Sequence, residues 1–149
     1  LEDLGAKARL EAHFQAKNLW AAQENGATLR LVFDELGLSG LAVEPRDSRE
    51  REIVLDRPLG HDETIVYRLP EGARALELPP PVEVVVPGLV SYRQSLTAVE
   101  GGVEVHRRFE LQTRRVALAD YARFQDALRA IDLAEQRTLR IETRPAGGR

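Results

Sequence analysis

Apolar and polar residues alternate along most of the chain, and a period of two is the spacing of a strand with one buried face. The pattern predicts strands at residues 10–18, 28–34, 53–55, 64–69 and 82–86. The first segment keeps two interpretations, because Ala6, Leu10, Phe14 and Ala21 also fall near helical spacing. Residues 8–18 are therefore expected to form either a strand or a helix, and strict alternation favours the strand.

Turn residues separate these segments. Asn25-Gly26 is a hairpin signal before the second strand, and Pro70-Glu71-Gly72 ends the strand at 64–69. Residues 79–81 are three prolines, which force an extended backbone. The strand that follows them, at 82–86, is expected at a sheet edge, where a missing N–H does no harm.

The clearest hairpin lies between residues 92 and 111, with Glu100-Gly101-Gly102 as its turn. One face of the first strand carries four residues: Tyr92, Gln94, Leu96 and Ala98. The second strand has an apolar face made of Val103, Val105, Phe109 and Leu111. Its other face carries a polar, solvated set: Glu104, His106, Arg108, Glu110 and Gln112.

One segment changes period. Tyr121, Phe124, Leu128 and Ile131 recur at spacings of three and four, which predicts an amphipathic helix over about residues 119–136. Residues 139–141 alternate again as a final strand. The fold class is therefore mainly β: an antiparallel β-sandwich of about eight strands with one C-terminal amphipathic α-helix. We expect a single β-sandwich domain over residues 1–142 and a flexible tail over 143–149.

Composition narrows the function classes. The 149 residues carry a net charge of −3, and this mild acidity argues against a nucleic-acid partner. No apolar run is long enough for a bilayer span, so no direct membrane insertion is expected. The absence of cysteine excludes thiol catalysis, disulfides and thiolate metal sites. The absence of methionine, even at position 1, leads us to expect a piece of a longer chain.

Histidines and serines give no catalytic pattern. His13, His61 and His106 are too far apart in the sequence for a short-spaced metal motif, and each is expected to be solvated. The cluster His61-Asp62-Glu63 could supply ligands, but a polar turn is the simpler interpretation. Ser39, within Gly37-Leu38-Ser39-Gly40, lacks the spacing and the strand–turn–helix setting of a nucleophile elbow.

Arginine pairs and aromatic residues are also weak signals. Arg107-Arg108 and Arg114-Arg115 divide between two faces of a strand, so ordinary salt bridges are expected and not an anion-binding patch. Trp20, Tyr92 and Tyr121 could form a sugar-binding platform near a surface, although a core role is more common. The sequence therefore assigns no catalytic, cofactor-binding or metal-binding residue, and no cofactor.

The order and spacing of several segments resemble a known family. These segments are residues 65–72 (IVYRLPEG), 78–82 (LPPPV), Tyr92, 101–103 (GGV), 107–111 (RRFEL) and the helix with Asp120, Tyr121, Phe124, Leu128, Ile131 and Asp132. Together they resemble, over residues 50–142, the C-terminal β-rich domain of unknown function that follows the catalytic core in bacterial transglutaminase-like proteins of the cysteine-protease superfamily. The family's Ser/Thr-Pro-Glu helix cap is replaced here by Leu118-Ala119-Asp120.

The resemblance implies a non-catalytic accessory domain. It implies as partner the preceding catalytic domain of the same chain, and as location the bacterial cell envelope, the periplasm or the exterior. The family's catalytic Cys, His and Asp belong to that core, and no residue of this chain matches them. The alternative is a stand-alone module that binds a glycan or a peptide through exposed aromatics or the edge strand at 82–86.

Overall fold

The computed structural model describes residues 20–23, 26–31, 36–42, 49–55 and 59–143. The predicted segment at 10–18 and His13 lie outside these residues, as do residues 144–149 of the predicted tail. Residue 143 itself still belongs to the last strand.

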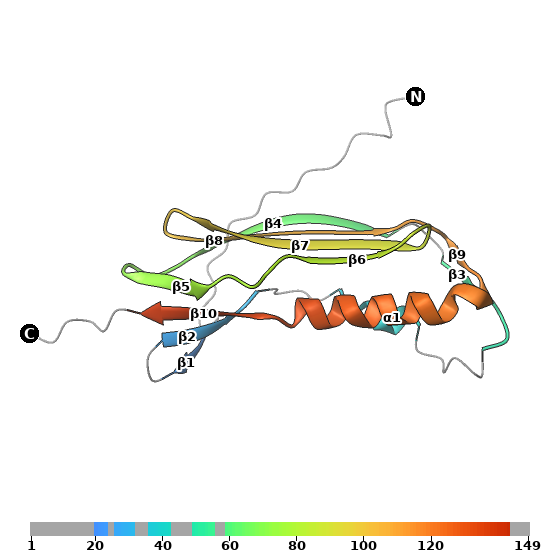
Figure 1. Cartoon of the computed structure of the whole chain (residues 1–149), viewed down its shortest axis with the longest axis horizontal. Helices are drawn as coiled ribbons and strands as arrows, with labels where there is room; N and C mark the ends of the chain where they lie inside the picture. The colour runs from blue at the N-terminus through green and yellow to red at the C-terminus, as the bar shows by residue number, and fades with distance from the viewer. Residues whose placement is uncertain (1–19, 24–25, 32–35, 43–48, 56–58, 144–149) are drawn as a thin grey trace, which may run out of the picture.

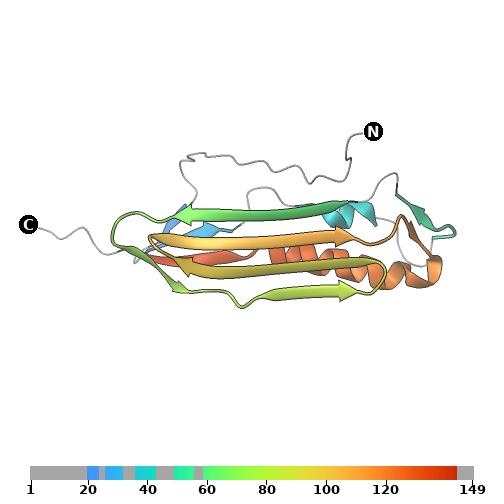
Figure 2. The same ribbon diagram turned by 90° about the horizontal axis from the view of Figure 1, so that it is seen from above.

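A long antiparallel sheet forms one layer of the molecule (Figure 2). Its strands, in spatial order, are β4 (Gly60–Arg68), β8 (Gly102–Leu111), β7 (Val90–Val99) and β6 (Val82–Val86). The predicted hairpin is confirmed as β7–β8, which pairs Val99 with Gly102 across a turn where Gly101 has a φ of 66°. The predicted edge position of the proline-flanked strand is confirmed as well, because β6 is the last strand of this sheet.

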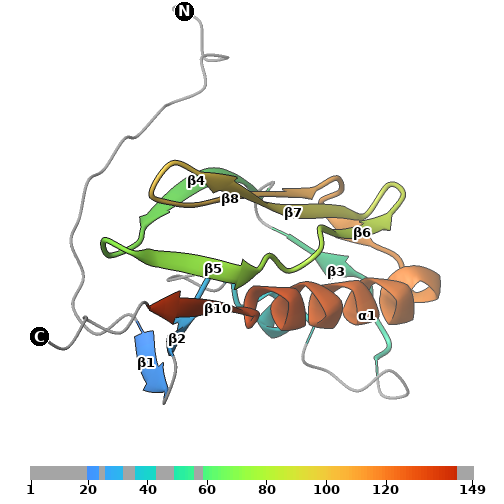
Figure 3. The same cartoon turned by 60° about the vertical axis from the view of Figure 1, so that its left-hand side comes forward.

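The second layer combines a small sheet and a helix (Figures 1 and 3). The small sheet contains, in order, β1 (Trp20–Gln23), β2 (Gly26–Arg30), β10 (Thr138–Thr143) and β5 (Ala73–Glu77). The helix α1 (Leu118–Glu135) runs directly into β10, so helix and small sheet lie end to end under the same face of the long sheet. Among the described residues, no helix combines the length and the apolar composition that crossing a lipid bilayer needs.

Two short elements complete the half of the molecule that contains α1 (Figure 1). β3 (Ile53–Val54) pairs with β9 (Arg115–Val116), and the 3₁₀-helix η1 (Leu38–Leu41) packs against α1. The fold class expected from the sequence is confirmed: an antiparallel β-sandwich with one C-terminal helix, which begins and ends one residue earlier than the predicted 119–136.

One prediction about a strand needs correction, and one strand of the small sheet, β5, was not predicted. The interpretation of His61-Asp62-Glu63 as a polar turn is wrong, because β4 begins at Gly60 and pairs His61 with Phe109 of β8. A ladder needs only backbone groups, so a polar segment is held in the sheet once its partner strand is in place. The strand β5 was not expected, and it pairs with β10 directly after the confirmed turn at Gly72.

The apolar core has two parts, one under each half of the long sheet. The helix cluster includes Tyr92, Phe109, Leu111, Phe124, Leu128 and Ile131. The sheet cluster consists of Leu29, Leu31, Tyr67, Val103, Val105, Leu139 and Ile141. Each large apolar side chain contributes about 1.5–3 kcal/mol when it is buried, so both clusters are needed for a stable domain.

Candidate functional site

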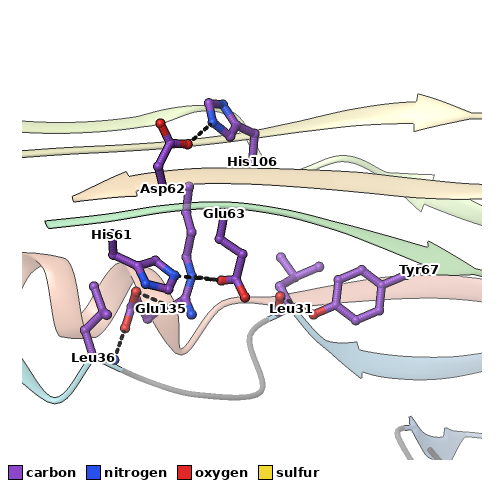
Figure 4. A network of polar contacts seen from close by, with 9 residues as sticks. Leu31, Leu36, His61, Asp62, Glu63, Tyr67, His106 and Glu135 are labelled. Carbon is purple, nitrogen blue, oxygen red and sulfur yellow. Dashed lines mark hydrogen bonds and ion pairs between the residues drawn. The ribbon is translucent and has the colours of Figure 1, made fainter. Parts of the chain in front are cut away.

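Charged side chains meet between the long sheet and the C-terminal end of α1, where the two apolar clusters adjoin. We call this group, His61, Glu63, Arg107 and Glu135, the polar junction. Figure 4 labels His61, Glu63 and Glu135 of this group. The Arg107 guanidinium donates from Nε to Glu63 Oε2 at 2.5 Å and from Nη1 to Glu135 Oε1 at 2.7 Å. His61 Nε2 lies 3.0 Å from Glu63 Oε2. Arg107 and Glu135 are 2% and 0% exposed, so the junction contains a buried ion pair.

Strand and helix periodicity place these side chains inward. Arg107 is in phase with Val105 and Phe109 on the inner face of β8, and Glu63 stands opposite it on β4. Glu135 follows Ile131 by four residues and therefore shares the buried face of α1. Four charged or titratable groups thus occupy positions that the periodicity reserves for apolar residues.

Contacts within the junction shift the pKa values of Glu63 and Arg107 in opposite directions. Burial by itself would raise the pKa of Glu63, but the hydrogen bonds from His61 and Arg107 and the charge of Arg107 hold this pKa below its usual value. Burial would lower the pKa of Arg107, yet Glu63 and Glu135 raise it, so the guanidinium stays charged. Burial also raises the pKa of Tyr67, whose hydroxyl donates to the Leu31 carbonyl.

The stability of the domain is expected to depend on pH through Glu63. A carboxyl whose pKa is lowered by folding stabilises the folded state above its unfolded pKa of about 4.3, and this stabilisation is lost as the pH falls through the lower folded value. Glu63→Gln removes the titrating group. Urea unfolding at pH 7, 5, 4 and 3 should show that E63Q is less stable than the wild type at pH 7 but loses less stability on acidification. Parallel pH profiles for the two proteins would contradict this assignment.

Two carboxylates at the end of α1 also hold the chain around η1. Glu135 Oε2 accepts from the Leu36 N–H at 2.7 Å. The two oxygens of Asp132 accept from the N–H groups of Leu38 and Ser39, both at 2.8 Å. This arrangement places Ser39 in a 3₁₀ turn whose backbone docks on the helix, a setting that differs from the strand–turn–helix of a nucleophile elbow.

Replacement of Asp132 tests this contact. Asp132→Ala leaves two N–H groups without their acceptor and is expected to lower the free energy of unfolding by about 1–3 kcal/mol. Asp132→Asn keeps one acceptor oxygen and should lose less. Glu110→Ala, on the exposed outer face, is the control and should stay within about 0.5 kcal/mol of the wild type. Equal stabilities of D132A and E110A in urea unfolding would contradict the role of Asp132.

The outer face of the long sheet carries a separate set of polar pairs. Asp62 Oδ1 lies 2.9 Å from His106 Nε2, and both side chains are about half exposed, at 54% and 48%. Figure 4 shows this pair on the opposite side of the sheet from His61 and Glu63. Since Asp62 points away from its neighbours on β4, the cluster His61-Asp62-Glu63 does not converge. In the part of the chain that the structure describes, no group of three or more His, Cys, Asp or Glu side chains could hold a metal ion.

One of the two arginine pairs divides between two strand faces as the sequence indicated, whereas Arg114 lies just before β9 and is not part of a strand. Arg107 and Arg108 lie on opposite faces of β8, and Arg108 approaches Glu110 at 3.9 Å. Arg115 pairs with Glu52, and Arg114 Nε donates to the Leu55 carbonyl at 3.4 Å. These are ion pairs and backbone contacts of ordinary kind, as expected.

Tyr92 and Tyr121 have the core role that the sequence favoured over a surface platform. Tyr92 is 0% exposed and Tyr121 is 3% exposed, so neither lies near the surface, where the platform interpretation placed them. Both pack in the helix cluster, because their inward positions on β7 and α1 are covered by the opposite layer. The side chain of Trp20 lies outside the described part of the structure. A glycan or peptide site built on Tyr92 therefore loses its main residue.

The described contacts of the junction are ion pairs and hydrogen bonds between its charged and titratable side chains. General-base catalysis needs a hydroxyl or a water within hydrogen-bond reach of the base. Within the described residues, His61 is bonded to Glu63 and His106 to Asp62, and neither ring is bonded to a serine or threonine hydroxyl. The Arg107–Glu135 pair was not anticipated, although its signal was present: a charged residue in phase with the apolar positions of each element.

The fold and the junction define a β-sandwich domain with one covering helix and a polar layer between two apolar clusters. The chain belongs to the DUF3858 family, a domain of unknown function with a solved structure, whose family model matches residues 30–141.

A similar fold occurs in a proposed protease from Parabacteroides distasonis, with a TM-score of 0.64 and 17% sequence identity. The similarity covers 81% of this chain and 24% of that protein, so the chain spans about a quarter of the protein that it matches. No curated protein matches the chain.

Proposed function

We propose that this chain is a non-catalytic accessory domain of a bacterial transglutaminase-like protein. In this proposal it is the C-terminal domain, and it packs on a catalytic core elsewhere in the same chain or positions the substrate of that core. The observation that carries the proposal is the coverage of the Parabacteroides protein: the fold of this chain corresponds to 24% of a much longer protein that is a proposed protease.

Two further observations support the proposal. The segments that resemble the transglutaminase-like family fall on β4, the proline connection to β6, the β7–β8 hairpin and α1, which together make up most of the long sheet and its cover. The polar side chains of the junction also form hydrogen bonds with one another or with the backbone, which is consistent with a structural role in an accessory domain. The same resemblance supports a location in the cell envelope, the periplasm or the exterior.

The first test uses the isolated chain. It is expected to unfold in a single cooperative transition and to show no turnover of peptide or ester substrates. His61→Ala and Ser39→Ala should leave this baseline unchanged. Measurable turnover that is lost in either variant would overturn the proposal, because it would place an active site within the domain.

The second test uses the longer parent protein, with and without this domain. The full protein is expected to hydrolyse or transfer a peptide amide. Deletion of the domain is expected to lower this activity, through a change in KM, in kcat or in the stability of the core. Unchanged kinetics and unchanged core stability after deletion would contradict an accessory role.

A further inference from the structure

Three buried polar atoms of β7 have no partner among the described residues: Tyr92 Oη, Gln94 Oε1 and Gln94 Nε2. Tyr92 is 0% exposed and Gln94 is 1% exposed, so bulk solvent does not reach either group. An unpaired buried polar group costs free energy comparable to that of a lost hydrogen bond, and such groups are rare in folded proteins. Both atoms of the Gln94 amide are unpaired, so exchanging its O and N would not relieve the problem.

Both residues face the polar junction. Tyr92 and Gln94 are two residues apart on β7 and therefore lie on the same inner face. Gln94 stands opposite Arg107 in the β7–β8 register, and the charges of Glu135 and Arg107 act on the Tyr92 hydroxyl. The unpaired atoms thus adjoin the polar junction, where charged side chains of the described interior are gathered.

We propose that the interior of the domain binds one or more ordered water molecules, held by Tyr92 and Gln94 beside the polar junction. A buried water typically makes about three hydrogen bonds to polar groups that are otherwise unsatisfied. The hydroxyl of Tyr92 both donates and accepts, and the amide of Gln94 supplies a donor and an acceptor. Such a mixed set fits water. A hard cation such as Ca²⁺ or Mg²⁺ takes oxygen ligands and would leave the amide N–H₂ group unpaired, whereas an anion would leave the amide oxygen unpaired.

The water makes the junction a continuous polar layer. Arg107 is already bonded to Glu63 and Glu135 through two of its nitrogens, and Glu135 is bonded to Leu36. Water on Tyr92 and Gln94 extends this set of hydrogen bonds from β4 and β8 to β7. The long sheet is then connected to the end of α1 across its width by polar contacts as well as by apolar packing.

Two substitutions that keep side-chain shape test the proposal by the sign of their effect. Tyr92→Phe and Gln94→Met remove the polar atoms and preserve most of the volume. If water is bound, each variant removes one of its partners, and the urea midpoint is expected to fall. If the groups are dry, each variant removes an unpaired polar group, and the midpoint should rise. An unchanged or raised midpoint in both variants overturns the proposal.

Two matched variants set the scale for a polar group that does have a partner. Tyr67→Phe removes the hydroxyl that donates to the Leu31 carbonyl, and Gln125→Met removes the buried amide that donates to the Ala42 carbonyl at 2.8 Å. Both must lower the urea midpoint. Y92F and Q94M are expected to shift it in the same direction.

The direct observation uses the unmodified chain and does not depend on the folding of any variant. A crystal structure at a resolution that shows ordered solvent is expected to place density within about 2.7–3.2 Å of Tyr92 Oη and of at least one Gln94 amide atom. Protein–water cross-relaxation in NMR should detect the same water as long-lived. A dry interior at both residues in the crystal structure overturns the proposal.

Discussion

Replacing Arg107 with methionine is expected to lower the free energy of unfolding by about 3–5 kcal/mol, because the variant leaves a buried carboxylate without its counter-charge. Glu135 is 0% exposed and its Oε1 accepts from Arg107 at 2.7 Å, so bulk solvent does not reach the carboxylate that loses the guanidinium. Methionine has a length similar to that of the aliphatic part of arginine, which keeps the loss of packing small. Urea unfolding followed by circular dichroism measures the effect.

The neighbouring residue provides the control. Arg108→Met changes the same residue type on the same strand, but Arg108 is 54% exposed and its ion pair with Glu110 is long, at 3.9 Å, so a change within about 0.5 kcal/mol is expected. The double variant R107M/E135Q removes both charges and keeps an acceptor for the Leu36 N–H, so it should be more stable than R107M alone. Equal stabilities of R107M and R108M would show that the buried pair does not hold the junction together.

Truncation of Phe124 to alanine is expected to cost about 3–5 kcal/mol, the range for a buried phenylalanine in a well-packed core. Phe124 is 0% exposed and lies in the middle of α1, where it faces the long sheet within the helix cluster. The loss combines the transfer free energy of the ring with the cavity that remains, since the sheet above is held by its hydrogen bonds and cannot collapse fully.

A leucine on the same helix separates packing from helix propensity. Leu133 is 68% exposed, and Leu133→Ala should stay within about 0.5 kcal/mol of the wild type because alanine is an equally good helix former. A loss below 1 kcal/mol for F124A in thermal or urea unfolding would mean that α1 is not packed on the sheet as described.

The sequence was sufficient to predict the elements whose own residues carry the signal. The β7–β8 hairpin has alternating apolar residues on both sides of a glycine turn, and α1 has four apolar residues at helical spacing. Patterns of this kind are local, so no knowledge of the partner elements is needed. The edge position of β6 was predictable for the same reason, from the prolines that flank it.

Elements whose stability comes from a distant partner could not be predicted in this way. β5 is a short segment of two alanines, one leucine and two charged residues, and it is a strand because β10, more than 60 residues later, supplies its hydrogen bonds. The first residues of β4 are polar, and β8 holds them in the ladder.

The polar junction illustrates the same limit. Arg107 and Glu135 each stand at an apolar position of their element, but only the packing of α1 on the sheet shows that the two charges meet.

The position of β10 has a consequence for the order in which the chain can fold. It is the last described strand, yet it lies between β2 and β5 in the small sheet, and its Leu139 pairs with Leu29, about 110 residues earlier. On the ribosome, β1, β2 and β5 therefore emerge long before the strand that joins them. The two strands of the β7–β8 hairpin are adjacent in the sequence and can pair first, whereas the small sheet closes only after synthesis has passed residue 143. A nascent chain stalled within α1 would expose the inner face of the long sheet to chaperones.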